Sequence, residues 1–189
     1  MRGRGGHGCR SDARSGEQSV VTSHALGLVM PLDPKGSILP FHLQGKGHGV
    51  LQTVTIEGSS HTIRAEGHPA FGGKDSAPSP LDYALGALAS CNQVTTFIVA
   101  RDLGIALGNF EIDLRAKLDN SVLVFGAEGN PNFSSVSLDV TVETDASDAD
   151  FDRLASEVER RCPLTQLYAR SGVDVTNKWR NRRLAKAAG

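Results

Sequence analysis

Residues 79–99, SPLDYALGALASCNQVTTFIV, decide the fold because they predict one long helix. Ser79 is suited to the N-cap position and Pro80 to the first helical position, where its missing N–H costs nothing. Asp82, at the third position, completes an acidic capping box. At the other end, Gly104 can adopt the left-handed conformation that commonly ends a helix. A helix between these two ends would be about 36 Å long.

This helix should be buried on most sides, because apolar residues occur almost all the way round it. Cys91 lies in its middle, and its neighbours on the same side are small or polar: Ala84, Ala87 and Thr95. Another group can therefore approach the Cys91 thiol, although the residue taken alone is better explained as a small buried hydrophobic side chain. Polar residues within the stretch and its polar N-cap argue against a membrane span.

The composition indicates one domain that acts on small molecules. A chain of 189 residues can build one sizeable core. Its 20 basic and 21 acidic residues leave a formal net charge of −1, so we expect neither nucleic acid nor a membrane as a partner. Three cysteines without an apolar signal segment predict a reducing, cytoplasmic location. The cysteine and histidine spacing does not fit a zinc site, and we expect no metal or cofactor.

We expect a single domain at residues 19–178 with a tail on each side. Residues 1–18 are rich in Gly, Arg and Ser and cannot bury enough surface to become ordered, so Cys9 should stay exposed and free. Residues 179–189 are basic and are predicted to form a solvated C-terminal tail in which Trp179 could be an anchor.

Alternation of apolar and polar residues predicts an antiparallel sheet with one face in solvent. The predicted strands are residues 20–30, 49–57, 61–66, 110–118, 136–143 and a short one at 172–175. The second and third of these have a turn between them and form a hairpin signature. Residues 121–125 could extend the strand of residues 110–118.

A second helix is predicted to begin near Ser147. Its apolar stripe, Phe151, Leu154, Val158 and Cys162, has intervals of three, four and four residues and places Cys162 on the core face. Pro163 must stop or kink this helix, and residues 164–170 form a further turn. If Pro163 is the first residue of that turn, the free backbone N–H groups at the start of the turn lie near Cys162 and favour its thiolate.

Two core-facing cysteines on two helices, packed on an antiparallel sheet, resemble the OsmC/Ohr family. The residues that carry the resemblance are Gly72 and Gly73, the stretch 78–91 (PSPLDYALGALASC) and residues 161–165 (RCPLT). The resemblance covers roughly residues 45–177. It implies an α+β, two-layer OsmC-like fold, with an antiparallel sheet on two main helices. It also implies a homodimer that exchanges its N-terminal strands.

The resemblance further implies a thiol-dependent peroxidase for organic hydroperoxides, with a role in oxidative stress defence. Cys91 would attack the peroxide oxygen and become a sulfenic acid. Cys162 would then condense with it to form a disulfide, which an external dithiol reduces. The neighbouring thiol would protect the sulfenic acid from further oxidation.

The chain differs from the well-studied peroxidases of this family at two places. They carry a Glu ten residues before the first cysteine, where this chain has Leu81, followed by Asp82. Asp82 is either a catalytic carboxylate or simply the capping one. For their thiolate-stabilising Arg, the candidates are Lys46, His48 and Arg64, although Lys cannot reproduce a bidentate guanidinium.

These differences leave an alternative function of another class open. On the same scaffold, the protein could bind a small ligand or act in regulation without efficient peroxidase activity, and its thiols would then react slowly. A purely structural role would leave the Cys162-Pro163 motif without an explanation.

Overall fold

A computed structural model describes residue 36 and residues 38–184. The chain divides into two units, residues 1–40 and 41–189, and all the elements below belong to the second. The predicted N-terminal tail, Cys9 and the predicted strand at residues 20–30 lie outside the described residues. The elements follow one another as β1 (Leu43–His48), β2 (Leu51–Ile56), β3 (Thr62–Glu66), η1 (Pro69–Phe71), α1 (Pro80–Leu103), β4 (Leu107–Leu118), α2 (Ser121–Phe125), β5 (Phe133–Thr144), α3 (Asp148–Arg161), α4 (Pro163–Arg170) and β6 (Asp174–Arg183).

The long helix α1 has the bounds and the caps that the sequence predicts. The Ser79 hydroxyl accepts a hydrogen bond from the Asp82 N–H at 3.2 Å, and the Asp82 carboxylate accepts one from the Ser79 N–H at 3.0 Å. Gly104 follows the last turn with φ of 70°. These signals are local in sequence, so both ends of the helix can be predicted without knowledge of any tertiary contact.

The described residues cover only part of the α1 surface. The helix packs against α3, α4, β3 and β4, and the side chains of Leu88, Asn92 and Val99 are buried there. Val94 and Phe97 remain 57% and 50% exposed. By length and hydropathy α1 could span a membrane, but its packing makes it the central helix of this domain.

The first sheet consists of β1, β2 and β3 in that order, all antiparallel. The β2–β3 hairpin is confirmed, whereas β1 was not predicted. Its sequence, LQGKGH, lacks an apolar alternation and all six residues are exposed. Gly47 is required by the close pairing of β1 with β2, because a Cβ atom there would lie 2.5 Å from the Leu51 carbonyl oxygen.

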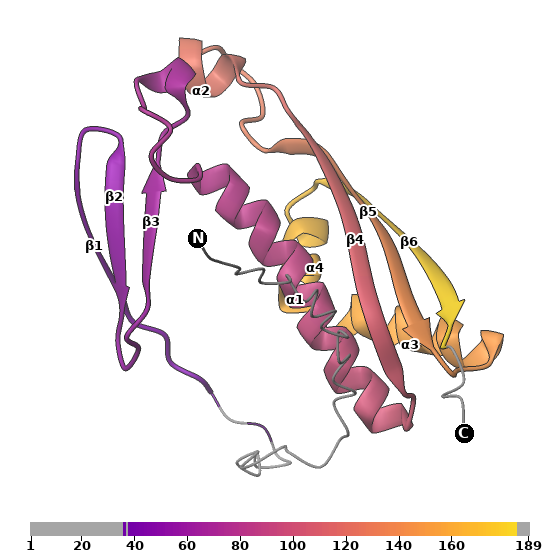
Figure 1. The fold of residues 1–189 in the computed structure, drawn as a ribbon. Coiled ribbons are helices and arrows are strands. Elements are labelled where there is room, and N and C mark those ends of the chain that lie inside the picture. Colours follow the sequence, from indigo (N-terminus) through magenta and orange to yellow (C-terminus); the bar gives the residue numbers. More distant parts are fainter. Residues whose placement is uncertain (1–35, 37, 185–189) are drawn as a thin grey trace, which may run out of the picture. The chain divides into compact units, whose positions relative to one another are not determined.

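The second sheet has the order β4-β5-β6, and the three strands lie side by side in Figure 1. The antiparallel pairing of β4 with β5 is confirmed. The expectation of an entirely antiparallel sheet is wrong for β6, which is parallel to β5. The cause is the connection: α3 and α4 carry the chain back across the sheet, so that β6 enters from the same end as β5.

Strand β6 is longer than the short strand predicted at residues 172–175. It continues to Arg183, so the assignment of residues 179–183 to a basic tail is wrong. Charges on neighbouring strands explain the difference, since Arg182 pairs with Glu111 on β4 at 3.1 Å and with Glu143 on β5 at 3.6 Å. On the other face, Trp179 packs against the core.

Residues 121–125 form the short helix α2. The possible extension of β4 through these residues is therefore not found. The Asp119 carboxylate accepts a hydrogen bond from the Ser121 N–H at 2.9 Å and so holds the first turn. Gly126, with φ of 66°, ends it. The Asp119 carboxylate at the start and the left-handed Gly126 at the end outweigh the strand preference of the apolar residues between them.

The core lies between the second sheet and the helices, and α3 contributes the stripe that its spacing predicts. Ser147 caps α3, and its hydroxyl accepts a hydrogen bond from the Asp150 N–H at 3.2 Å. Among the described residues, the largest fully buried side chains are those of Leu88, Val99, Val136, Leu138, Val140, Val142, Leu154 and Val158, together with Asn92, Thr96, Thr144 and Cys162. Cys162 therefore lies on the core face, as predicted.

Candidate dithiol site

The structure brings Cys91 and Cys162, the two cysteines among the described residues, together. Cys91 projects from the middle of α1 and is half-buried, whereas Cys162 is fully buried. Both are free thiols, and their sulfur atoms are hydrogen-bonding neighbours. Two helices that are far apart in sequence thus build one dithiol site.

Pro163 determines where Cys162 lies. It occupies the first position of α4, so Cys162 both ends α3 and begins α4, with an extended backbone of φ −72° and ψ 112°. The Cys162 N–H still donates to the Val158 carbonyl at 2.8 Å, and its own carbonyl accepts from the Gln166 N–H at 3.0 Å. The free N–H groups at the start of α4 therefore face the thiols.

Polar groups at this helix start act on both sulfur atoms. The Leu164 N–H faces Cys91, and the Thr165 N–H and hydroxyl face Cys162. The Thr95 hydroxyl, one turn after Cys91 on α1, reaches both thiols. Cys162 does not form a regular N-cap hydrogen bond through its side chain, but this arrangement of donors still favours an anion on its sulfur.

The environment separates the two thiols by their acidity. Burial raises the pKa of Cys91, and the adjacent Cys162 raises it further, although the Leu164 N–H and Thr95 oppose the change. Burial also disfavours the anion of Cys162, but the hydrogen bonds from Thr165, Cys91 and Thr95 outweigh it and lower the pKa of this thiol. Because the two thiols interact, the first proton is lost by the pair, and the hydrogen bonds around Cys162 favour the anion on that sulfur.

Sequence analysis gave no role to the two threonines that face the thiols. Thr95 follows Cys91 by four residues and Thr165 follows Cys162 by three, the spacings that place side chains on one face of a helix. That spacing was the available signal. It could not show which of the many polar residues on these helices would meet the sulfur atoms.

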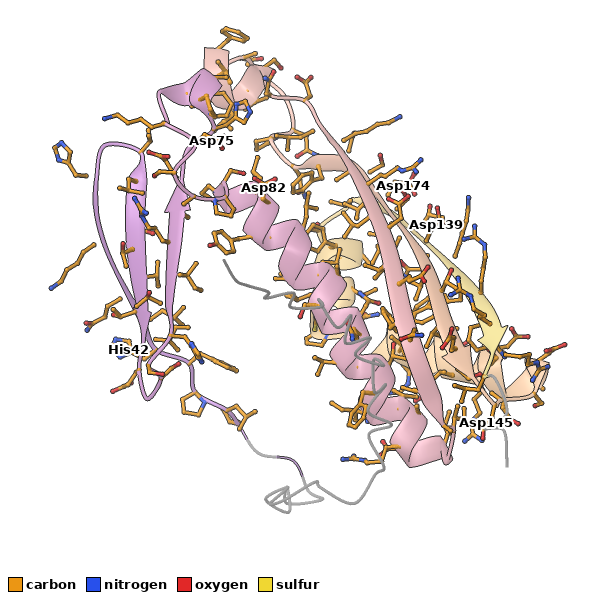
Figure 2. All side chains as sticks on the ribbon, in the orientation of Figure 1. His42, Asp75, Asp82, Asp139, Asp145 and Asp174 are labelled. Atoms are coloured by element: carbon orange, nitrogen blue, oxygen red, sulfur yellow. The ribbon has the colours of Figure 1, made fainter. Side chains whose placement is uncertain are left out.

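Asp82 lies at the start of α1 (Figure 2), where it completes the capping box of the N-cap residue Ser79. Its carboxylate also accepts a hydrogen bond from the Ser79 hydroxyl at 2.7 Å, and the hydrogen bonds from the Ser79 side chain and backbone lower the pKa of Asp82. It precedes Cys91 by nine residues, or about 13 Å along the helix axis. The adjacent Leu81 is partly exposed. Both positions therefore belong to the start of α1 and are distant from the thiols.

The basic candidates lie on the first sheet. Lys46 on β1 and Arg64 on β3 are both register partners of Thr53 on β2, so they share one face of this sheet. Arg64 donates to the Ser76 hydroxyl at 3.2 Å. His48 ends β1. The structure therefore places all three residues in one sheet, of which β3 packs on α1. None of them is among the groups that act on the two thiols.

Two pockets flank the turn of α1 that precedes Cys91. One, of about 290 Å³, is lined by Ala84, Ala87, Asn132, Phe133, Leu164, Leu167, Tyr168 and Ser171. The other, of about 460 Å³, is lined by Pro78, Asp82, Tyr83, Gly86, Ala87 and Ser90. Ala87 belongs to both, and Leu164 connects the first pocket to the thiols through its N–H. Among the described residues, no group of three or more His, Cys, Asp or Glu is placed to hold a metal ion.

The chain belongs to the OsmC-like protein family. The family model matches residues 73–178, more than half of the chain, and this range contains α1, α3, α4 and both cysteines of the dithiol site. The family predicted from the residues is therefore confirmed. No curated protein matches the sequence.

Solved structures of the same family share the fold. An OsmC-like protein from Mycoplasma pneumoniae has 14% sequence identity and a TM-score of 0.64, with 76% of this chain and 97% of that chain covered. The organic hydroperoxide resistance protein OsmC from Legionella pneumophila has 15% identity and a TM-score of 0.57, with 76% and 98% covered. The organic hydroperoxide resistance protein OhrB of Bacillus subtilis has 17% identity and a TM-score of 0.51, with 76% and 100% covered. These similarities confirm the α+β, OsmC-like fold.

Proposed function

We propose that this protein is a thiol-dependent peroxidase that reduces organic hydroperoxides in defence against oxidative stress. The observation that carries the proposal is the contact between the Cys91 and Cys162 thiols at the start of α4, next to an apolar pocket. Two neighbouring thiols can donate the two electrons that reduction of one peroxide requires, and they form a disulfide as they do so. The names of the hydroperoxide resistance proteins with this fold point in the same direction.

The exposure of the two thiols assigns their roles. Cys162 is 0% exposed and Cys91 is half-buried, so a peroxide reaches Cys91 first. The alkyl part of the substrate would lie in the pocket that includes Ala87 and Leu164, because burial of an apolar group there is favourable. Cys91 is therefore the peroxidatic residue of the proposal and Cys162 the resolving one.

The reaction has three steps. The Cys91 sulfur attacks the outer peroxide oxygen, an S–O bond forms as the O–O bond breaks, and the alkoxide leaves as the alcohol after it takes up a proton. The Cys162 thiolate then attacks the Cys91 sulfenic acid, which forms the disulfide and releases hydroxide that becomes water. An external dithiol finally reduces the disulfide by thiol–disulfide exchange and returns both thiols.

The proposal includes a homodimer in a reducing cytoplasm. Lys46 and Arg64 belong to the N-terminal sheet, so a role for either as the cation near a thiolate requires a second copy that exchanges this sheet. The exposed side of α1, with Val94 and Phe97, provides an apolar surface for that copy. Asp82 is proposed as a capping residue and not as a catalytic one.

The test is peroxide consumption by the reduced protein with cumene hydroperoxide and a dithiol such as dihydrolipoamide. We expect turnover by the wild type, none by Cys91→Ser, and a single turnover by Cys162→Ser, since this variant cannot form the internal disulfide. Cys9→Ser is the matched control and should keep the wild-type rate. Wild-type consumption no faster than that of Cys91→Ser would overturn the proposal.

One observation favours a second function, a small-ligand-binding or regulatory protein on the same scaffold. Burial raises the pKa of Cys91, and Leu81 stands where the characterised peroxidases of the family have a Glu. Under this function the Cys91 thiol would react with iodoacetamide at pH 7 no faster than a free cysteine does. An alkylation rate well above that of free cysteine would exclude a slow thiol and favour the peroxidase.

A further inference from the structure

Asn92 is a fully buried polar residue in the middle of α1, directly after Cys91. Its side chain is 0% exposed. The Nδ2 atom donates to the Leu88 carbonyl at 3.0 Å and to the Thr165 hydroxyl oxygen at 3.1 Å. The Oδ1 atom is buried without a partner among the described residues. An apolar residue would avoid this unpaired atom, so the amide must contribute something that packing cannot.

The Leu88 carbonyl determines which way the amide points. A carbonyl oxygen can only accept a hydrogen bond, so it must face Nδ2, because a flipped amide would place Oδ1 against it. The second Nδ2 hydrogen then goes to the Thr165 oxygen. With that lone pair occupied, the single hydroxyl hydrogen of Thr165 is left for the sulfur that it faces, that of Cys162.

We propose that Asn92 is a positioning residue that turns the hydroxyl hydrogen of Thr165 toward the Cys162 sulfur and so stabilises a thiolate at that buried cysteine. The amide does not touch either sulfur atom in this role. It acts through Thr165, and the unpaired Oδ1 is the cost of this orientation. Without Asn92 the hydroxyl can rotate and present its lone pair to the sulfur, which disfavours an anion there.

Hydrogen bonds carry this effect because formal charges contribute little around Cys162. From α1 the facing groups are Cys91 and Thr95, and from α4 the facing group is Thr165. On α3, the adjacent Arg161 directs its guanidinium to Asp102 on α1, at 2.8 Å. Tyr168 on α4 is buried, and its burial raises its pKa, so this phenol adds no negative charge near Cys162 at neutral pH.

The consequence for the reaction rests on the proposed function. With the charge on Cys162, the proton of Cys91 passes to Cys162 as Cys91 forms its bond to the peroxide oxygen. The departing alkoxide takes this proton and becomes the alcohol, which leaves Cys162 as a thiolate again. That thiolate displaces hydroxide from the Cys91 sulfenic acid as the S–S bond forms, and the hydroxide becomes water by taking up a proton from a buffer acid in the solvent. The buried cysteine thus acts as the base first and as the resolving nucleophile second.

The experiment measures thiolate formation in the full chain by its absorbance at 240 nm as a function of pH. All variants carry Cys9→Ser, so that the signal comes from the dithiol. We expect Thr165→Val and Asn92→Ala each to raise the first titration midpoint by about one pH unit, a tenfold weaker acid. Thr165→Ser retains the hydroxyl and should keep the original midpoint. In the double variant, Asn92→Ala should add nothing to Thr165→Val, because it acts through that hydroxyl.

Thr96→Val is the matched control. Thr96 is fully buried on the same helix, and its hydroxyl donates to the Asn92 backbone carbonyl at 2.8 Å. Its removal should lower Tm and leave the midpoint unchanged. If Asn92→Ala fails to fold, Asn92→Leu fills the space with apolar atoms and tests the same shift.

The first midpoint of the thiolate titration distinguishes a positioning role of Asn92 from a purely structural one. A shift in the Asn92 and Thr165→Val variants with an unchanged midpoint in Thr96→Val supports the inference, whatever the Tm values are. Folded Asn92 variants with the wild-type midpoint overturn it. The peroxide assay tests the proposed function independently of this titration. A shifted midpoint in the variants without peroxide turnover by the wild type would support the positioning role of Asn92 and contradict the peroxidase function.

Discussion

At the scale of single residues, the site depends on two thiols with different surroundings. Cys91 is reachable and its anion is disfavoured, whereas Cys162 is buried and its anion is favoured by the start of α4. Cys91 is therefore the thiol that a substrate can reach, and Cys162 is the thiol whose anion is favoured. This division agrees with a dithiol in which one sulfur meets the substrate and the other stores the charge.

Mild oxidation should link these two residues and leave Cys9 free. A disulfide requires the two Cα atoms to lie within about 7 Å of each other. The hydrogen-bonding contact between the two thiols is compatible with that separation. The measurement is peptide mapping after one equivalent of hydroperoxide, where we expect a linked Cys91–Cys162 peptide. Recovery of a Cys91 sulfinic acid with Cys162 still reduced would contradict the resolving role.

At the scale of elements, the start of α1 carries a prediction that separates the two roles considered for Asp82. Asp82→Ala removes the capping carboxylate and should lower stability by about 0.5–1 kcal/mol, as measured by urea unfolding. Ser79 lowers the pKa of Asp82 in the folded state, so the difference from wild type should be complete above pH 4 and disappear as the pH falls through that pKa. A tenfold loss of peroxide turnover with unchanged stability would contradict a capping role.

Strand β6 carries a second prediction at this scale. Truncation after Asn177 removes most of the strand, including Trp179, which packs against both parts of the core. We expect this variant to lose its cooperative unfolding transition, because the edge of β5 and the apolar core become exposed. Truncation after Leu184 keeps the strand and is the control. Wild-type stability of the shorter chain would restore the interpretation of these residues as a tail.

At the scale of the whole molecule, the exposed side of α1 predicts a homodimer. Val94 and Phe97 are large apolar side chains left half-exposed on the central helix of the domain, an arrangement typical of an interface. Sedimentation at micromolar concentration should give the mass of two chains, and Phe97→Asp should give that of one. Leu123→Asp, at a 62% exposed apolar residue of α2, is the matched control and should remain dimeric. A wild-type monomer would refute the prediction.

The sequence by itself determined the elements whose signals are local. The caps at Ser79 and Gly104 place the ends of α1, and the stripe of α3 places Cys162 on the core face. Alternation places β4 and β5, and the two cysteine motifs indicate the family. In each case the signal lies within a few residues of the structure that it determines, so no tertiary contact is needed to interpret it.

Only the tertiary structure decided the pairings between distant segments. Strand β1 has no apolar face of its own and depends on β2 for its register, and β6 is parallel because two helices precede it. The hydrogen bond between Asn92 and Thr165 joins residues 73 positions apart. Periodicity indicates which face of a helix is buried but not which side chain of another helix it will meet, and the acidity of a thiol depends on that neighbour.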